Sequence, residues 1–463
     1  MKRILAAALL AALLTSCLIL GVFAEAPLVT SAEKRPIVSE PVGVTHPVGT
    51  TTLSSSYHGG NQSRVVSVSS GTYVGILTNE EADGDWGEMS LIHISNDGVT
   101  RLIKTDKCLG SNVNGVTVTI MADNNEDIWV YCGWDDYNTQ AVTNVWFYDV
   151  SEDTVTVYSE TESIVYGGSY GYSVANINPD DGMIWAVFNG GNVPGWLMVK
   201  GFNMNTREWG ELVAIKVPDR MLYHYGFPDG NGGIILVTQR GPSNSYTIAD
   251  TGETVRNAVK RLHNMHDDST YTWDKLYIFH IPDPTKKEFE QITITEPVYD
   301  VENGVYPNIN HAACGDVLLD SKGILHVAYY ESDNATPGTH FFVKSYDTKN
   351  NFNYLGGGEI LYTYGRDMGG NSRFFEDTTG QVYIINSYDT ENGDYIGIWA
   401  AMDESGTEYR LVWDDKVTVG GCYVANSRNN STPSDIATML ADYDDDYAVI
   451  KIDIGAIRAM MKK

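Results

Sequence analysis

The side chains in this sequence best suited to chemistry are a few histidines, tyrosines and arginines. His311 and His224 can exchange a proton near neutral pH, Tyr223 and Tyr225 can donate one, and the guanidinium of Arg373 can grip a carboxylate. β-Elimination on a uronate needs a base for the C5 proton, an acid for the leaving oxygen and a cation for the carboxylate. We therefore predict that these five residues are catalytic on an acidic sugar.

A second set of polar residues occupies similar places, each shortly before a tight turn and a β-rich run. Asparagine forms hydrogen bonds with sugar hydroxyls, and arginine binds anions. We therefore expect substrate contacts from His58, Arg64, Asn114, Tyr170, Tyr172, Asn310, Asn371 and Arg428. Arg64 and Arg373 both lie seven residues before their turns, which predicts equivalent positions. The alternative is that such side chains only bind ordered water and neighbouring strands.

The elements that must position these residues form a repeat. A strand-like run, a turn of Gly, Asp, Asn or Ser, and a run rich in Val, Ile, Tyr, Phe and Trp recur seven times, with turns near residues 71, 127, 182, 233, 323, 380 and 445. Most of the intervals suit one four-stranded blade. The sequence predicts an all-β fold, a seven-bladed β-propeller over residues 25–463 as one domain.

The two ends of the repeat predict how the ring closes. The last unit stops about two strands into its blade, after residues 447–454. PIVSEPV (36–42) and VGTTTLSS (48–55) in the N-terminal segment 25–56 can supply the missing strands and leave no open edge. Blade four carries an insertion, 242–272, with helical periodicity in 252–268. It is either a lid over the ligand or a neutral elaboration.

The first residues predict export. A basic start and an apolar run end in Val22-Phe23-Ala24, which predicts a signal peptide over 1–24 and a secreted protein. A lipid anchor on Cys17, after Leu14-Thr15-Ser16, and a retained membrane helix are the alternatives. We expect Cys108, Cys132, Cys314 and Cys422 to be scattered buried thiols, with disulfides as the alternative.

Charge limits the partners. With 60 Asp+Glu against 31 Lys+Arg the net charge is −29, and such a surface repels phosphate backbones, which excludes nucleic acid. We expect a monomer that binds a glycan or polysaccharide and needs no cofactor or metal, with no membrane contact beyond the N-terminal anchor. Structural Ca²⁺ at acidic stretches such as 123–127 is the alternative. Trp86, Trp196 and Trp273 could stack on sugar rings or pack as core.

Two stretches resemble known propellers. LLDSKGILHVAYY (318–330) resembles the degenerate repeats of sialidase-like (BNR-repeat) propellers, although the strict motif S-x-D-x-G-x-x-W is not present. NINHAACGDVLLDSKGILHVAYYES (308–332) resembles the histidine-bearing strand of propeller polysaccharide lyases. The resemblance implies a carbohydrate-active protein that acts on acidic glycans, of uronate or sialate type, as a lyase or glycosidase. The alternative is a propeller without catalysis that binds glycans or proteins at the cell surface.

Overall fold

The structure is a computed structural model, and the elements below all belong to the unit Ile37–Lys463. It describes residues 37–44, 52–53, 63–79, 87–108, 117–136, 140–163, 169–190, 195–217, 221–240, 275–295, 309–333, 339–363, 372–390, 393–416, 422–425, 429–443 and 446–462. The predicted signal peptide (1–24) and blade-four insertion (242–272) lie outside these residues.

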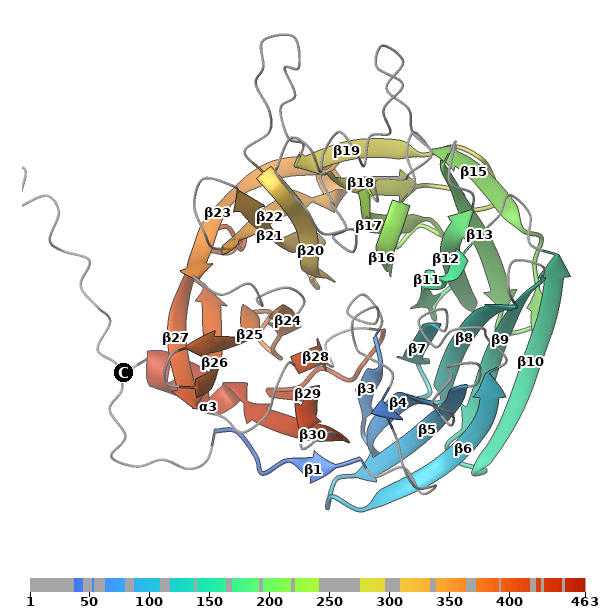
Figure 1. Ribbon diagram of the computed structural model, residues 1–463, viewed down its shortest axis with the longest axis horizontal. Coiled ribbons are helices and arrows are strands. Elements are labelled where there is room, and N and C mark those ends of the chain that lie inside the picture. Colours follow the sequence, from blue (N-terminus) through green and yellow to red (C-terminus); the bar gives the residue numbers. More distant parts are fainter. Residues whose placement is uncertain are drawn as a thin grey trace, which may run out of the picture. The chain divides into compact units, whose positions relative to one another are not determined.

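Seven antiparallel sheets stand around one axis in chain order, which confirms the seven-bladed β-propeller (Figure 1). Blade one contains β3 (Val65–Val68), β4 (Gly71–Asn79), β5 (Gly87–Ser95) and β6 (Thr100–Cys108). Blade two contains β7 (Thr117–Ala122), β8 (Ile128–Asp136), β9 (Gln140–Asp149) and β10 (Thr154–Ser163). Blade three contains β11 (Ser169–Asn178), β12 (Met183–Gly190), β13 (Gly195–Asn203), β14 (Glu208–Trp209) and β15 (Val213–Val217). Blade four contains β16 (Met221–Pro228), β17 (Ile234–Arg240), β18 (Leu276–Ile281) and β19 (Glu290–Thr295). Blade five contains β20 (Ile309–Leu319), β21 (Ile324–Asp333), β22 (Thr339–Asp347) and β23 (Asn353–Thr363). Blade six contains β24 (Ser372–Glu376), β25 (Val382–Thr390), β26 (Gly393–Ala401) and β27 (Tyr409–Lys416). Blade seven contains β28 (Cys422–Ala425), β29 (Ile436–Tyr443), β30 (Asp446–Asp453) and β1 (Val42–Gly43).

The core lies between the blades. Seven apolar clusters each join two neighbouring blades; Val66 of β3 and Ile120 of β7, for example, share one cluster, and Leu318 of β20 and Phe374 of β24 share another. Because both faces of each sheet are covered in this way, the strands are continuous runs of β-branched and aromatic residues. Cys132 and Cys314 are buried thiols, as predicted.

An aspartate organises the turn after the innermost strand in four blades. One carboxylate oxygen accepts two backbone N–H groups of the turn, as when Asp320 accepts from Lys322 at 3.0 Å and Ile324 at 2.7 Å. The other oxygen contacts a ring of the following strand in three of these blades, and in blade four it contacts His280 of β18. The four aspartates are Asp123, Asp229, Asp320 and Asp377. Asp123, in one of the acidic stretches considered for Ca²⁺, thus has a structural role, and no cluster of three possible metal ligands occurs within the described residues.

Neighbouring turns are joined by a recurrent hydrogen-bonded link. Ser321 in the turn of blade five donates its backbone N–H, at 3.0 Å, and its hydroxyl to Glu376 of blade six. Thr378 of blade six donates the same two groups to Asp435 of blade seven. Ser69 and Glu126 repeat the link between blades one and two. The turn face is therefore fixed by polar contacts, whereas the blade interfaces are apolar.

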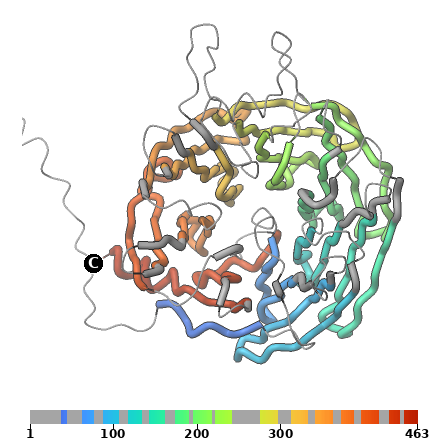
Figure 2. Tube along the Cα trace, viewed as in Figure 1, coloured from blue at the N-terminus to red at the C-terminus, as the bar shows by residue number. Residues whose placement is uncertain are grey.

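The ring closes with one N-terminal strand in blade seven. Val42 of β1 pairs with Val449 of β30, so the N-terminal segment lies along the outside of the C-terminal blade (Figure 2). The prediction that residues 48–55 supply a second closing strand to blade seven was wrong, because β2 (Thr52–Leu53) pairs with β4 of blade one. The turn near residue 445 joins the second and third strands of its blade, because β28 already supplies the innermost strand.

The connection between β28 and β29 crosses two neighbouring blades. The backbone N–H of Thr432 donates to Ser67 of blade one at 2.8 Å, and the carbonyl of Asn429 accepts from Ala122 of blade two at 3.0 Å. Thr432 also donates its hydroxyl to Glu126 at 2.8 Å. This connection thus joins the last blade to the first two, at the seam where the ring closes.

The chain ends in a short helix, α3 (Ile454–Met461), that the sequence analysis did not predict. Asp453 caps its N-terminus by accepting from Ala456 at 2.7 Å. Arg458 donates to Asp435 at 3.1 Å and 2.5 Å and also bonds Asp377, so the helix ties together the turns of blades six and seven. No helix within the described ranges is long and apolar enough to cross a membrane.

Replacing Arg458 by methionine is expected to lower the free energy of unfolding by about 3 kcal/mol, because it leaves the buried carboxylate of Asp377 without its cation. The hydrogen bond from Arg458 lowers the pKa of Asp435 to about 2. Because this pKa is lower in the folded protein, the ionised Asp435 stabilises the fold at pH values above the ordinary pKa of 3.8, and this stabilisation is lost as the pH falls toward 2. Urea unfolding should therefore show the difference at pH 7 and a smaller one at pH 2.5. Arg410→Met, which removes an exposed pair with Glu408, is the control and should change little.

Candidate functional site

A belt of buried polar side chains lies at the level where the innermost strands begin. Two of its members pair directly with the first residue of a strand: Asn189 with Ser169 of β11, and Asn386 with Ser372 of β24. Gln239 and His224 lie at the same level in blade four. The buried polar belt consists of Arg64, Asn189, His224, Gln239, Ser372 and Asn386. This is the level at which the sequence placed its candidate ligand site.

Arg64 directly precedes β3 and is only 5% exposed. Its carbonyl accepts from Gly75 of β4 at 2.9 Å, which fixes its backbone. Among the residues that the structure describes, none pairs with its guanidinium, and the buried Nε has no hydrogen-bond acceptor. A buried cation without an anion is costly, so such a group indicates a site where a ligand supplies the negative charge.

His224 links blades three and four. Its Nε2 lies 2.7 Å from Oδ1 of Asn189 and its Nδ1 lies 2.9 Å from Oγ1 of Thr238. Burial lowers the pKa of His224 to about 3, so the ring is neutral at physiological pH. Both nitrogens are occupied in these contacts, which favours a structural role and leaves His311 as the better candidate for a base.

His224 should make the protein less stable in mild acid. Its folded pKa, about 3, lies below the ordinary value of 6.5, so between these values the unfolded chain binds the proton and unfolding becomes more favourable as the pH falls. We expect His224 to lower the free energy of unfolding by about 2 kcal/mol when the pH falls from 6.5 to 5. His224→Gln should flatten the dependence of the unfolding free energy on pH, measured by urea titration. Equal slopes for the two proteins would contradict the buried, neutral ring.

Tyr225 and Arg373 meet at one backbone oxygen. The hydroxyl of Tyr225, from blade four, donates to the carbonyl of Gly315 at 3.1 Å, and Nη1 of Arg373, from blade six, donates to the same oxygen at 3.1 Å. Gly315 belongs to β20, the strand that also carries Asn310 and His311. His311 lies four residues upstream, about 13 Å along an extended strand. The structure thus brings two predicted catalytic residues to the strand that carries a third.

Tyr223 has a backbone conformation unusual for a strand. Its φ is +52°, in the left-handed region, and the pairing of β16 with β17 shifts register between Leu222 and Tyr225. Bulges of this kind redirect side chains, and strained backbone at a non-glycine residue is frequent at functional sites. The bulge thus gives Tyr223 a direction different from that of a regular strand residue, and the hydroxyl of Tyr225 donates to Gly315.

Four members of the buried polar belt were not predicted. Asn189, Gln239 and Ser372 lie at or next to the end of a strand, and Asn386 lies inside β25. In the sequence each residue marks the polar boundary of an apolar run. Both amide atoms of Asn386, which is 1% exposed, and the hydroxyl of Ser372 have no hydrogen-bond partner within the described part of the chain. Unmet hydrogen-bonding capacity at this depth indicates ordered water or a ligand.

The remaining candidate residues are only partly described. His58, Asn114, Asn371 and Arg428 lie outside the described residues, as do Trp86 and Trp273, and the side chains of Tyr170, Tyr172, Asn310 and His311 are also outside them. Arg428 follows β28 in the chain, whereas the other candidates lie before or within an innermost strand. Trp196 is half-buried against the cluster of Phe188 and Met198, which favours a packing role for it.

Comparison with solved structures supports the fold. An ulvan lyase of polysaccharide lyase family 25, solved with -[GlcA(1-4)Rha3S]-, matches with a TM-score of 0.54 and 12% identity over 86% of this chain and 93% of that one. A second structure of a family 25 ulvan lyase gives 0.53, with the same identity and coverage. The polysaccharide lyase Uly1 gives 0.50 with 11% identity over 87% of this chain and 91% of that one. No family model and no curated protein matches the sequence. The chain is thus a seven-bladed β-propeller that resembles propeller polysaccharide lyases in fold; a specific relation to sialidase-like repeats stays a prediction.

Proposed function

We propose that this protein is an exported polysaccharide lyase that cleaves uronate-containing glycans by β-elimination. The observation that carries the proposal is Arg64, a buried guanidinium for which the described residues supply no anion. A uronate carboxylate would supply it in a bidentate contact. The similar solved structures are lyases, and one was solved with a glucuronate-containing saccharide, which supports the same substrate class.

The proposed reaction uses the candidate residues in three roles. Arg64 neutralises the uronate carboxylate and so makes the C5 proton more acidic. His311 takes that proton, the electron pair forms the C4–C5 double bond, and the bond from C4 to the leaving oxygen breaks. Tyr223 gives its proton to that oxygen. Arg373 and Tyr225 hold β20 through Gly315 and thereby position the strand of His311.

The test is an assay of glycan cleavage by the ultraviolet absorbance of the new double bond. Polymers that contain glucuronate should yield unsaturated products, and neutral polymers should not. His311→Ala and Tyr223→Phe should each lower the rate by about 10²–10⁴-fold. Full activity in His311→Ala would exclude the proposed base, and a wild-type protein inactive on every uronate polymer would exclude the lyase.

A glycan-binding propeller without turnover is the second candidate. The observation that favours it is that His224, Tyr225 and Arg373 all make contacts between blades, as structural residues do. A glycan array run beside the cleavage assay separates the two functions. Binding of uronate polymers that depends on Arg64 but gives no unsaturated product identifies the binding module.

A further inference from the structure

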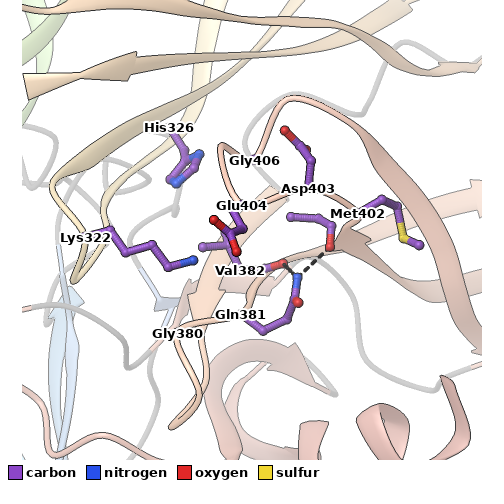
Figure 3. Close-up of a pocket in the computed structure, with 10 residues that line it drawn as sticks. Lys322, His326, Gly380, Gln381, Val382, Met402, Asp403, Glu404 and Gly406 are labelled. Atoms are coloured by element: carbon purple, nitrogen blue, oxygen red, sulfur yellow. Dashed lines mark hydrogen bonds between the residues drawn. The ribbon is translucent and has the colours of Figure 1, made fainter. Parts of the chain in front are cut away.

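A cavity of about 220 Å³ opens on the turn face, between blades five and six. It is at the opposite ends of the innermost strands from the buried polar belt. Lys322 comes from the turn after β20, Gln381 from the turn after β24, and Met402, Glu404 and Gly406 from the connection after β26 (Figure 3). The ring of His326 lies beside Gly406. The space far exceeds the ~30 Å³ of one water and is below the ~300 Å³ of a drug-sized ligand site, so it suits one small molecule.

Two opposite charges face this cavity without pairing. The ammonium of Lys322 and the carboxylate of Glu404 both extend into it (Figure 3). No ion pair within 4.0 Å joins them, and neither side chain has another polar partner among the residues that the structure describes. In contrast, the neighbouring Asp403 is fully engaged: its two oxygens accept from Ser405, Thr407 and Glu408.

The backbone beneath each charge is held in place. The N–H of Lys322 donates to Asp320 at 3.0 Å, and its carbonyl accepts from Lys349 at 2.6 Å. Asp403 fixes the connection that carries Glu404 through bonds of 2.7–2.9 Å. The two charged side chains are exposed, and they extend toward the cavity from backbone positions that these hydrogen bonds fix.

The cavity wall distinguishes between ligand classes. The Nε2 of Gln381 is bonded to the carbonyls of Ala401 and Val382, at 2.6 Å and 3.3 Å, so its carbonyl oxygen is left as an acceptor. The wall thus offers one cation and two acceptors, a carboxylate and an amide. None of the described residues that line it is a tyrosine, tryptophan or phenylalanine, so this part of the wall offers no aromatic face on which a sugar could stack.

We propose that this cavity binds a small zwitterion of the α-amino acid class. The ligand carboxylate contacts Lys322, and its ammonium contacts Glu404 and the carbonyl of Gln381. Each contact is a charge-assisted hydrogen bond. The site is separate from the proposed glycan site and does not depend on it.

The test is titration of the whole protein with glycine and alanine, followed by calorimetry and ligand-observed NMR. Both should bind, and glycine amide, acetate and glucose should bind at least about tenfold more weakly. Lys322→Met and Glu404→Gln should each weaken glycine binding by at least about tenfold. Lys286→Met and Glu152→Gln, at exposed charges elsewhere on the turn face, are the matched controls and should leave binding unchanged.

Three results would overturn the proposal. The first is that neither amino acid binds, in which case Lys322 and Glu404 are only solvated surface charges. The second is that acetate or glucose binds as tightly as glycine, which would make the ligand class wrong. The third is that glycine binding survives both substitutions, which would place the site elsewhere. Cleavage of uronate polymers is measured separately, so its presence or absence does not affect this outcome.

Discussion

Replacing Arg64 by methionine is expected to lower the rate of uronate cleavage by about 10²–10³-fold, while the free energy of unfolding stays the same or rises slightly. The loss follows because the charge that stabilises the developing negative charge is gone. The unchanged stability follows because Arg64 is buried and the described residues give it no anion, and a methionine of similar length avoids the cost of desolvating a guanidinium. If Arg64 had only a structural role, its replacement would lower the free energy of unfolding and leave the cleavage rate unchanged.

Two measurements on the same preparations test this expectation: the rate of double-bond formation and the urea midpoint. Arg101→Met is the control, since Arg101 forms an exposed pair with Asp153 and should affect neither quantity strongly. Arg64→Lys should retain part of the activity, because the charge remains but the bidentate geometry is lost. If Arg64→Met unfolds the protein or cleaves at the wild-type rate, Arg64 does not bind the substrate carboxylate.

Deleting residues 37–44 is expected to lower the free energy of unfolding by about 5 kcal/mol or more. Ile37 and Val44 are buried in two different apolar clusters, and burial of such side chains contributes about 1.5–3 kcal/mol each. The deletion also removes the pairing of β1 with β30 and exposes an open strand edge.

Urea unfolding followed by circular dichroism measures the effect of this deletion. The control removes 26–33, the same number of residues from the separate unit Met1–Pro36, and should leave the midpoint unchanged. Val44→Asp keeps the chain length and should also destabilise strongly, because Val44 is fully buried. A soluble 37–44 deletion with the wild-type midpoint would show that the ring is stable without its closing strand.

The blade count could be predicted because each blade repeats local chemistry that the sequence displays. A turn built around an aspartate, such as Asp320 or Asp377, between two β-rich runs is visible in a single chain. Blade seven was misassigned because the acidic turn near residue 445 resembles these turns, whereas the connection after β28 does not. That connection takes its shape from contacts with blades one and two, which no local pattern reveals.

The candidate site was less predictable, for a physical reason. Arg64 and Arg373 could be selected by type and by distance from a turn, but their different surroundings depend on blades that are far apart in sequence. Gly315 accepts from Arg373 across two neighbouring sheets, whereas Arg64 has no such polar partner among the described residues. His224 looked like a general base, and only its burial shows that the ring stays neutral.

The pairing of β1 with β30 has a consequence for how the protein is made. The two strands are about 400 residues apart, so the first strand to leave the ribosome must wait for nearly the last one. At a synthesis rate of about 5–20 residues per second, this delay is roughly 20–80 s. During that time six blades can form from local hairpins, but the circle stays open and β3 lacks its neighbour from blade seven. A nascent chain stalled before residue 446 should therefore be protease-sensitive at both ends of the unfinished ring.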